Sequence, residues 1–157
     1  MHGKYDDGLG YDRIEDTLSK AFFATPQDVE AAYYEAIERA DLEAMMQVWA
    51  EDEEIVCIHP NGPRLSGYAK VRETWRRIFS GGAVLNIQVT PLGVIANPFT
   101  AVHSIVQQVI SKEDPSRQIA ILTTNVYSRG ASGWRLIVHH SGFAPPESFG
   151  EAPKVLH

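Results

Sequence analysis

The sequence has a single cysteine, no excess of basic residues and no long hydrophobic run, and each absence excludes a class of protein. Because Cys57 is the only cysteine among 157 residues, no intramolecular disulfide can form. The net charge is -6 and no stripe of Lys and Arg appears, so a nucleic-acid partner is not expected. No stretch is long enough to span a membrane, and the polar residues 1–10 do not resemble a signal peptide. These absences predict a cytoplasmic protein with no membrane partner.

Length and composition indicate one domain. The chain is 44% hydrophobic and 22% charged, which are values typical of a globular protein with one core. We expect the domain to span residues 25–146, with a C-terminal tail over 147–157. Residues 1–24 should form a tail and a short lead-in helix, because Ile14, Leu18 and Phe22 recur every four residues.

Three helices are predicted in the first half of the domain. Thr25 precedes Pro26 and stands three residues before Asp28, which together form a strong helix start. Asp41 is placed to cap a second helix. A third helix is expected over 67–80, where two glycines follow it.

After residue 82 the hydrophobic period changes from helical to strand-like. Pro91 and Gly93 interrupt the first of these strands, as they would at a bulge. The connections are short, so the sheet should be mostly antiparallel, and helices followed by consecutive strands indicate an α+β fold. The predicted strands span residues 55–59, 83–90, 100–111, 118–128 and 134–141.

The predicted strands are hydrophobic on both faces. Val102 and Val106 lie on one face of their strand, and Ile105 and Val109 lie on the other. A sheet that is wetted on one side would alternate hydrophobic and polar residues. One face should therefore pack against the helices, and the outer face predicts a second sheet and hence a homodimer.

The order of elements and three stretches resemble the nuclear-transport-factor-2-like superfamily. The stretches are MMQVWAEDEEIVCIHPNG, RLSGYAKVRETWRRIF and TTNVYSRGASGWRLIVHHSGFAPP. The resemblance implies a cystatin-like cone, with three N-terminal helices in the hollow of a curved sheet. Ketosteroid-isomerase-like and SnoaL-like enzymes share this fold, and the last stretch resembles the association domain of calcium/calmodulin-dependent protein kinase II. Fold alone therefore selects no function.

The resemblance places His59 where ketosteroid isomerases have their general base, and Tyr33 where they have a hydrogen-bond donor. His59 would be an acid/base group, because imidazole titrates near neutral pH. The alternative is that it only hydrogen-bonds a neighbouring strand or caps a loop. Between residues 83 and 141 the only acids are Glu113 and Asp114, in a predicted turn. Without a paired acid, steroid isomerase activity is not expected.

We expect the helices and the later strands to contribute the remaining residues of the pocket. Adjacent strand residues point to opposite faces, so His139 and His140 cannot both serve one site. Regular alternation groups His140 with Leu136, on the face predicted to meet the helices. Compared with the kinase association domain, however, the stretch between Trp134 and Ser141 is about one residue shorter, and such a slip exchanges the faces, so the choice between His139 and His140 stays open. Histidine spacing supports no metal site, and no glycine-rich loop indicates a nucleotide cofactor. The predicted pocket set is Trp49, Trp75, Phe79, His103, Asn125, Tyr127 and His140.

Two functions remain open. The first is a homodimeric SnoaL-like domain that binds a small hydrophobic, oxygenated molecule, with isomerase, cyclase or dehydratase-like chemistry through His59 and without a metal. The alternative is a non-enzymatic dimerisation or association module, in which the pocket is vestigial or binds a regulatory peptide.

Overall fold

The computed structural model describes residues 21–82 and 85–145. Most of the helix predicted over residues 11–23 lies outside these ranges. Its last three residues are not helical, and Phe23 instead forms a parallel bridge to Gly133.

The three predicted helices are confirmed, and the first two begin at the predicted caps. They are α2 (Pro26–Arg39), α3 (Leu42–Val48) and α4 (Tyr68–Ser80). The Thr25 hydroxyl accepts a hydrogen bond from the backbone N–H of Asp28 at 3.1 Å. The Asp41 carboxylate accepts one from the N–H of Ala44 at 3.0 Å. These caps satisfy backbone donors that the first turn of a helix leaves unpaired. None of the helices in the described ranges is long and apolar enough to cross a membrane.

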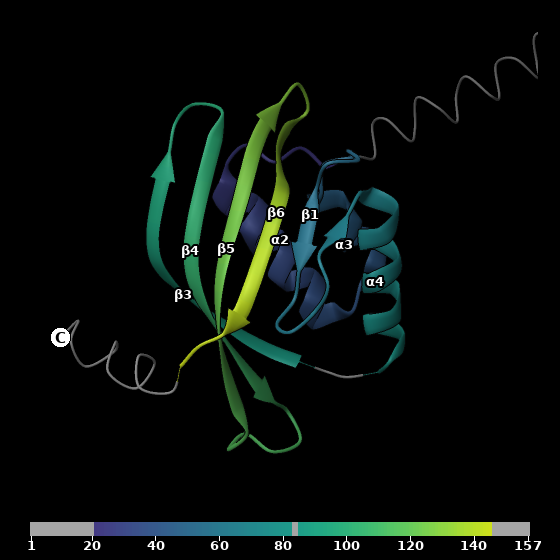
Figure 1. Ribbon diagram of the computed structural model, residues 1–157, viewed down its shortest axis with the longest axis vertical. Coiled ribbons are helices and arrows are strands. Elements are labelled where there is room, and N and C mark those ends of the chain that lie inside the picture. The colour runs from purple at the N-terminus through teal and green to yellow at the C-terminus, as the bar shows by residue number, and fades with distance from the viewer. Residues whose placement is uncertain (1–20, 83–84, 146–157) are drawn as a thin grey trace, which may run out of the picture.

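The strands form one six-stranded sheet in the order β2-β1-β6-β5-β4-β3. All neighbours are antiparallel except β1 and β6, which run parallel. In Figure 1 the sheet curves around α2, and α3 and α4 lie beside β1. The predicted α+β cone is therefore confirmed. The strands are β1 (Val56–Ile58), β2 (Leu65–Ser66), β3 (Leu85–Ala96), β4 (Thr100–Ser111), β5 (Gln118–Gly130) and β6 (Gly133–Phe143).

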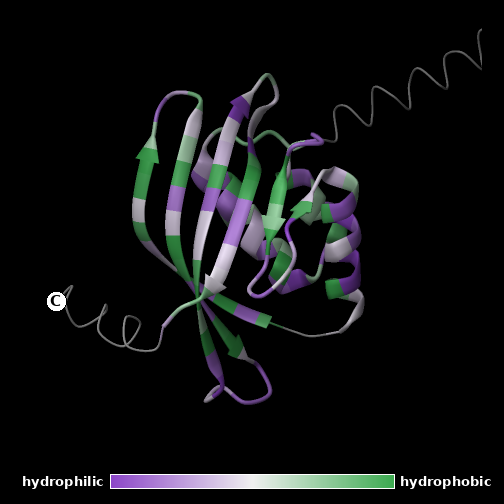
Figure 2. Ribbon diagram, viewed as in Figure 1, coloured by the Kyte–Doolittle hydropathy of each residue, from purple (hydrophilic) through white to green (hydrophobic). Residues whose placement is uncertain are grey.

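The core lies between the inner face of the sheet and the helices. Ile105 and Tyr127 of the sheet are buried there, against Val29 and Tyr33 of α2 and Trp49 after α3. Successive residues of the long strands point alternately to this inner face and to the outer one. Hydrophobic residues lie on both faces, and Figure 2 shows hydrophobic and polar segments mixed along these strands. Strand β3 carries the predicted irregularity, a register shift between residues 91 and 93.

Strand β6 contains a bulge that the sequence did not reveal. Leu136 and Val138 pair with consecutive residues of β5, so Ile137 between them has no partner. One extra residue reverses the alternation beyond it. Leu136 and His139 therefore both face the helices, whereas His140 is exposed on the outer face. The prediction that His140 shares the inner face with Leu136 is wrong for this reason.

Candidate functional site

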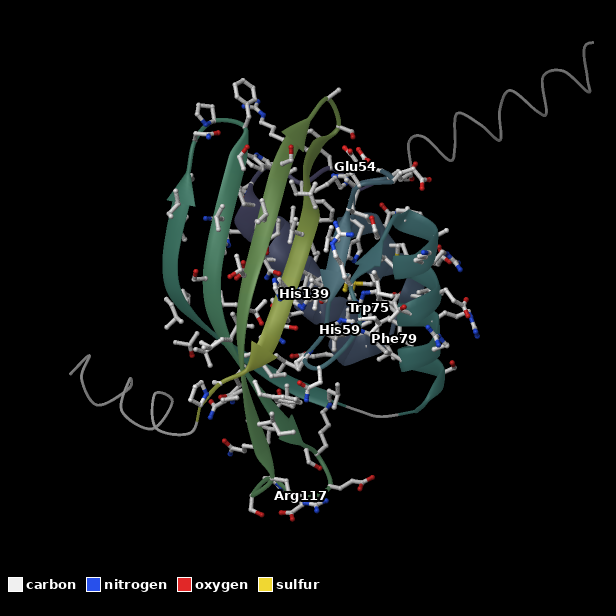
Figure 3. The ribbon with its side chains drawn as sticks, in the orientation of Figure 1. Glu54, His59, Trp75, Phe79, Arg117 and His139 are labelled. Carbon is white, nitrogen blue, oxygen red and sulfur yellow. The ribbon has the colours of Figure 1, made fainter. Side chains whose placement is uncertain are left out.

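A cavity of about 150 Å³ lies between α2, α4 and the inner face of the sheet. One part of its wall is aliphatic and is formed by Ile37, Ile78, Leu85, Ile87, Val109 and Ile121. The part that carries polar or aromatic groups is formed by Tyr33, His59, Trp75, Gln107, His139 and Ser141. Figure 3 shows His59, Trp75 and His139 close together between the sheet and α4. Because no charged side chain of the described residues lines the cavity, it favours neutral, mainly hydrophobic molecules.

His59 directly follows β1, and its ring lies within the aromatic part of this wall. The ring centroid is 5.1 Å from that of Trp75, which it meets edge-on, and 5.7 Å from that of His139. Its Nε2 is 3.6 Å from the sulfur of Cys57. Burial lowers the pKa of His59 and raises the pKa of the Cys57 thiol to about 12. Both groups are therefore neutral near neutral pH, and the imidazole can accept a proton.

His139 is a second imidazole in the cavity wall, and sequence analysis had assigned its neighbour instead. The residue is 2% exposed, and its ring lies 5.1 Å from that of Tyr33. Its Nδ1 is 2.7 Å from Oδ1 of Asn125. Burial, assisted by the nearby His59, lowers the pKa of His139 to about 3. The imidazole is therefore neutral, with its proton on Nδ1 and a lone pair on Nε2.

A buried hydrogen-bonded network lies behind His139. Asn125 donates from Nδ2 to the hydroxyl of Tyr34 at 3.3 Å. Tyr34 donates to Oε1 of Gln107 at 3.0 Å, and Thr123 donates to the same oxygen at 2.7 Å. Asn125, predicted as a pocket residue, does not line the cavity and instead orients His139 from behind. Such networks fix side-chain orientation when each buried group has a partner.

A separate buried cluster holds two residues that were predicted to line the pocket. Nδ1 of His103 is 2.5 Å from Oε2 of Glu30, and the Tyr127 hydroxyl donates to the same oxygen at 2.9 Å. Neither His103 nor Tyr127 lines the cavity. The prediction that they do is corrected, because Glu30 of α2 reaches the sheet and engages both.

Two more residues that were predicted to line the pocket, Trp49 and Phe79, do not line this cavity. Trp49 meets Tyr33 edge-on at 6.5 Å, and it lines a different cavity of about 660 Å³ near α3 and the β5–β6 turn. Phe79 packs on Trp75 with ring centroids 5.2 Å apart, outside the cavity lining. Of the predicted residues, the structure thus brings His59, Tyr33 and Trp75 together in one wall.

Three polar residues of the wall were missed by sequence analysis: Gln107, His139 and Ser141. Alternation from Ile105 places Gln107 on the inner face, and a glutamine within a hydrophobic strand was the available signal. The Ser141 hydroxyl donates to the carbonyl of Ile58 at 3.0 Å, which ties β6 to β1 beside the cavity. Within the described ranges, no three His, Cys, Asp or Glu side chains are grouped to hold a metal ion.

Fold and cavity together define a class: a cone-shaped α+β domain with a small hydrophobic cavity between its helices and its sheet. The sequence profile of the SnoaL-like domain matches residues 27–146, and the chain belongs to this family. Solved structures described as NTF2-like and as having a cystatin-like fold are similar to it, which confirms the fold inferred from the resemblance.

Two solved structures and one curated sequence illustrate the range of similar proteins. A protein from Thiobacillus denitrificans, described as a calcium/calmodulin-dependent protein kinase type II association domain, is 35% identical with a TM-score of 0.75. The similarity covers 80% of this chain and 99% of that one. A protein from Streptomyces avermitilis, described as a dehydratase of the NTF2-like family, is 27% identical with a TM-score of 0.67, over 74% and 91% of the two chains. The F-box protein SKIP8 of Arabidopsis thaliana is 26% identical over 125 residues, which are 78% of this chain and 52% of that protein. The chain thus spans about half the length of this curated relative.

Proposed function

We propose that this SnoaL-like domain binds a small, hydrophobic, oxygenated molecule in the cavity between α2, α4 and the sheet. The observation that carries the proposal is the pairing of two neutral imidazoles, the buried His139 and the half-buried His59, with a mostly aliphatic wall. Hydrophobic contacts would supply affinity, and the few polar groups would orient the ligand.

His59 is the proposed acid/base group. Burial lowers its pKa, so the ring is unprotonated and able to accept a proton near neutral pH. The chemistry that fits is transfer of a proton from a carbon next to a carbonyl group to another atom of the same molecule. His59 would take up the proton and return it, as an isomerase, cyclase or dehydratase-like reaction requires. The Cys57 thiol beside it is neutral and would take no part.

The active form in this proposal is a cytoplasmic homodimer. Ile95 and Leu122 are 76% and 40% exposed on the outer face of the sheet, and Val102, Val106 and Val126 of the same face are only partly buried. Apolar residues exposed on the face of a sheet are costly to leave in water. We therefore propose that the outer sheet face of a second copy of the chain packs against them.

A non-enzymatic association module is the second candidate. The 35% identity to a protein described as a calcium/calmodulin-dependent protein kinase type II association domain favours it. The cavity volume of about 150 Å³ also favours it, because ligand sites usually measure about 300–1,000 Å³. In this case the cavity would be a packing feature and the outer sheet face the functional surface.

Mass spectrometry of co-purified small molecules separates the two candidates. The wild type would be compared with His59→Ala and with His140→Ala, a matched control that removes an exposed histidine of the outer face. We expect a small molecule that co-purifies with the wild type and the control and is at least about tenfold depleted in His59→Ala, which corresponds to a loss of about 1.4 kcal/mol. Equal amounts in all three proteins would refute a role of His59, and no bound molecule in any of them would favour the association module.

A further inference from the structure

We propose that the cavity is selective for a neutral molecule with one aromatic ring and a hydroxyl group, a simple phenol, whose hydroxyl donates a hydrogen bond to Nε2 of His139. This inference rests on the proposed binding function, because it names a ligand class of the same site. A phenol has no proton on a carbon next to a carbonyl group, so it is named as a molecule that the cavity binds and not as the substrate of the proton transfer proposed for His59. It follows from the volume, the charge and the hydrogen-bond polarity of the wall.

Volume limits the ligand to one ring. The cavity measures about 150 Å³, and an apolar cavity of about this volume is large enough to bind benzene. A fused multi-ring molecule such as a steroid would exceed this volume. The aliphatic side chains of the lining, including Ile37, Ile87 and Val109, supply a surface suited to the face of a ring.

Charge excludes ionised ligands. The described residues that line the cavity include no Asp, Glu, Lys or Arg, and both lining histidines have lowered pKa values. A carboxylate or an ammonium group would lose its hydration there without gaining an opposite charge. The ligand is therefore neutral when bound.

Hydrogen-bond polarity decides between a hydroxyl and a carbonyl group. Oε1 of Gln107 accepts from both Thr123 and Tyr34, so the Tyr34 oxygen is left to accept from Nδ2 of Asn125. The Asn125 amide is thereby oriented with Oδ1 towards Nδ1 of His139, which must donate. Because Nδ1 of His139 carries the proton of this neutral ring, its Nε2 carries a lone pair and is an acceptor. A lone pair binds a ligand that donates, and a carbonyl oxygen cannot donate.

Gln107 supplies the complementary group. Because its Oε1 is engaged behind the wall, its Nε2 amide is the donor that remains, and the residue lines the same cavity as His139. His139 and Gln107 thus offer one acceptor and one donor. A hydroxyl group is able to satisfy both, since its oxygen accepts while its hydrogen is donated.

Titration calorimetry with phenol, toluene and benzaldehyde tests the inference. The three probes are similar in size, and they differ in carrying a donor, no polar group or an acceptor only. We expect phenol to bind the wild type at least about tenfold more tightly than either other probe, the equivalent of one hydrogen bond in an apolar site. The preference should disappear in His139→Phe and persist in His140→Phe, which changes the exposed neighbour.

A second measurement does not depend on the folding of a variant. Imidazole nitrogen chemical shifts of the wild type should show His139 with its proton on Nδ1. Protonation on Nε2, equal binding of the three probes, or tightest binding of benzaldehyde would overturn the inference while the proposed binding function stands. Binding of none of the probes, with no small molecule co-purified, would overturn both.

Discussion

His139 and Asn125 face each other across β6 and β5, with Nδ1 of the imidazole 2.7 Å from Oδ1 of the amide. Both side chains are almost fully buried. The contact fixes the tautomer of the imidazole, because the amide oxygen needs a donor, and burial keeps the ring in its neutral form. It also connects the cavity wall to the polar network behind it, so the stability of the fold and the character of the site depend on the same bond.

Folding stability should fall as the pH is lowered below about 6.5, the usual pKa of histidine. The folded protein lowers the pKa of His139 to about 3, so between these values the unfolded chain binds more protons. Because the unfolded chain takes up a proton at this residue, the unfolding free energy should fall by up to about 1.4 kcal/mol for each pH unit in this range. The lowered pKa of His59 acts in the same direction. Urea denaturation between pH 4 and 8 measures the slope.

The histidine responsible is identified by a pair of variants. His139→Gln should be less stable at neutral pH, with a flatter dependence on pH because it has no proton to gain. His140→Gln changes the exposed neighbour and should keep the wild-type slope. The assignment would be refuted if both variants had the same slope.

Replacement of Asn125 by leucine should destabilise the fold by about 2–4 kcal/mol, because buried donors lose their acceptor and the network is broken. The largest loss is at Nδ1 of His139, which has no other hydrogen bond among the described residues. Thr124→Val is the control, since the adjacent side chain is exposed on the opposite face and should change stability by no more than about 0.5 kcal/mol. Denaturant titration measures both, and similar losses would contradict the role given to Asn125.

Glu30→Ala should also cost about 2–4 kcal/mol of unfolding free energy, because His103 and Tyr127 both lose the carboxylate oxygen that they contact. Glu35→Ala on the same helix removes an exposed ion pair with Arg39 and should cost less than about 1 kcal/mol. Thermal denaturation would compare the two variants. Equal midpoints would show that the Glu30 cluster contributes no stability.

Leu122→Lys should convert the proposed homodimer into monomers, because it places a charge in the apolar outer face. Ile119→Lys is the matched control: Ile119 is 51% exposed on the same strand but belongs to the inner-face alternation. Sedimentation velocity should show a dimer for the wild type and the control and a monomer for Leu122→Lys. A monomeric wild type would refute the dimer.

Local signals predicted much of the fold. The caps at Thr25 and Asp41 are confirmed, and β4 spans the predicted residues 100–111. These features depend on neighbours within a few residues, so the sequence displays them directly. Strand β2 has only two residues and is defined by its pairing with β1. No local sequence pattern predicts that pairing.

The site was predicted less well, because its contacts are distant in the sequence. His59 and Tyr33 were placed in the pocket by the resemblance and Trp75 by its predicted helix, and the structure brings the three together. Glu30 was missed, because a charged helix residue suggests solvent exposure. Its buried partners follow 73 and 97 residues later in the chain. His139 was missed because the alternation rule assumes a regular pleat.

The unpaired Ile137 in β6 makes strand register, rather than residue identity, decide what the cavity contains. Deletion of Ile137 would give a regular strand in which Leu136 and His139 still face inward, whereas pairing of Ile137 with β5, without the bulge, would turn His140 inward and His139 outward. Loss of the bulge is thus able to re-line the cavity with every residue unchanged. Comparisons among relatives should therefore match strand register before they match histidines, since aligned residues on either side of a bulge can face opposite sides of the sheet.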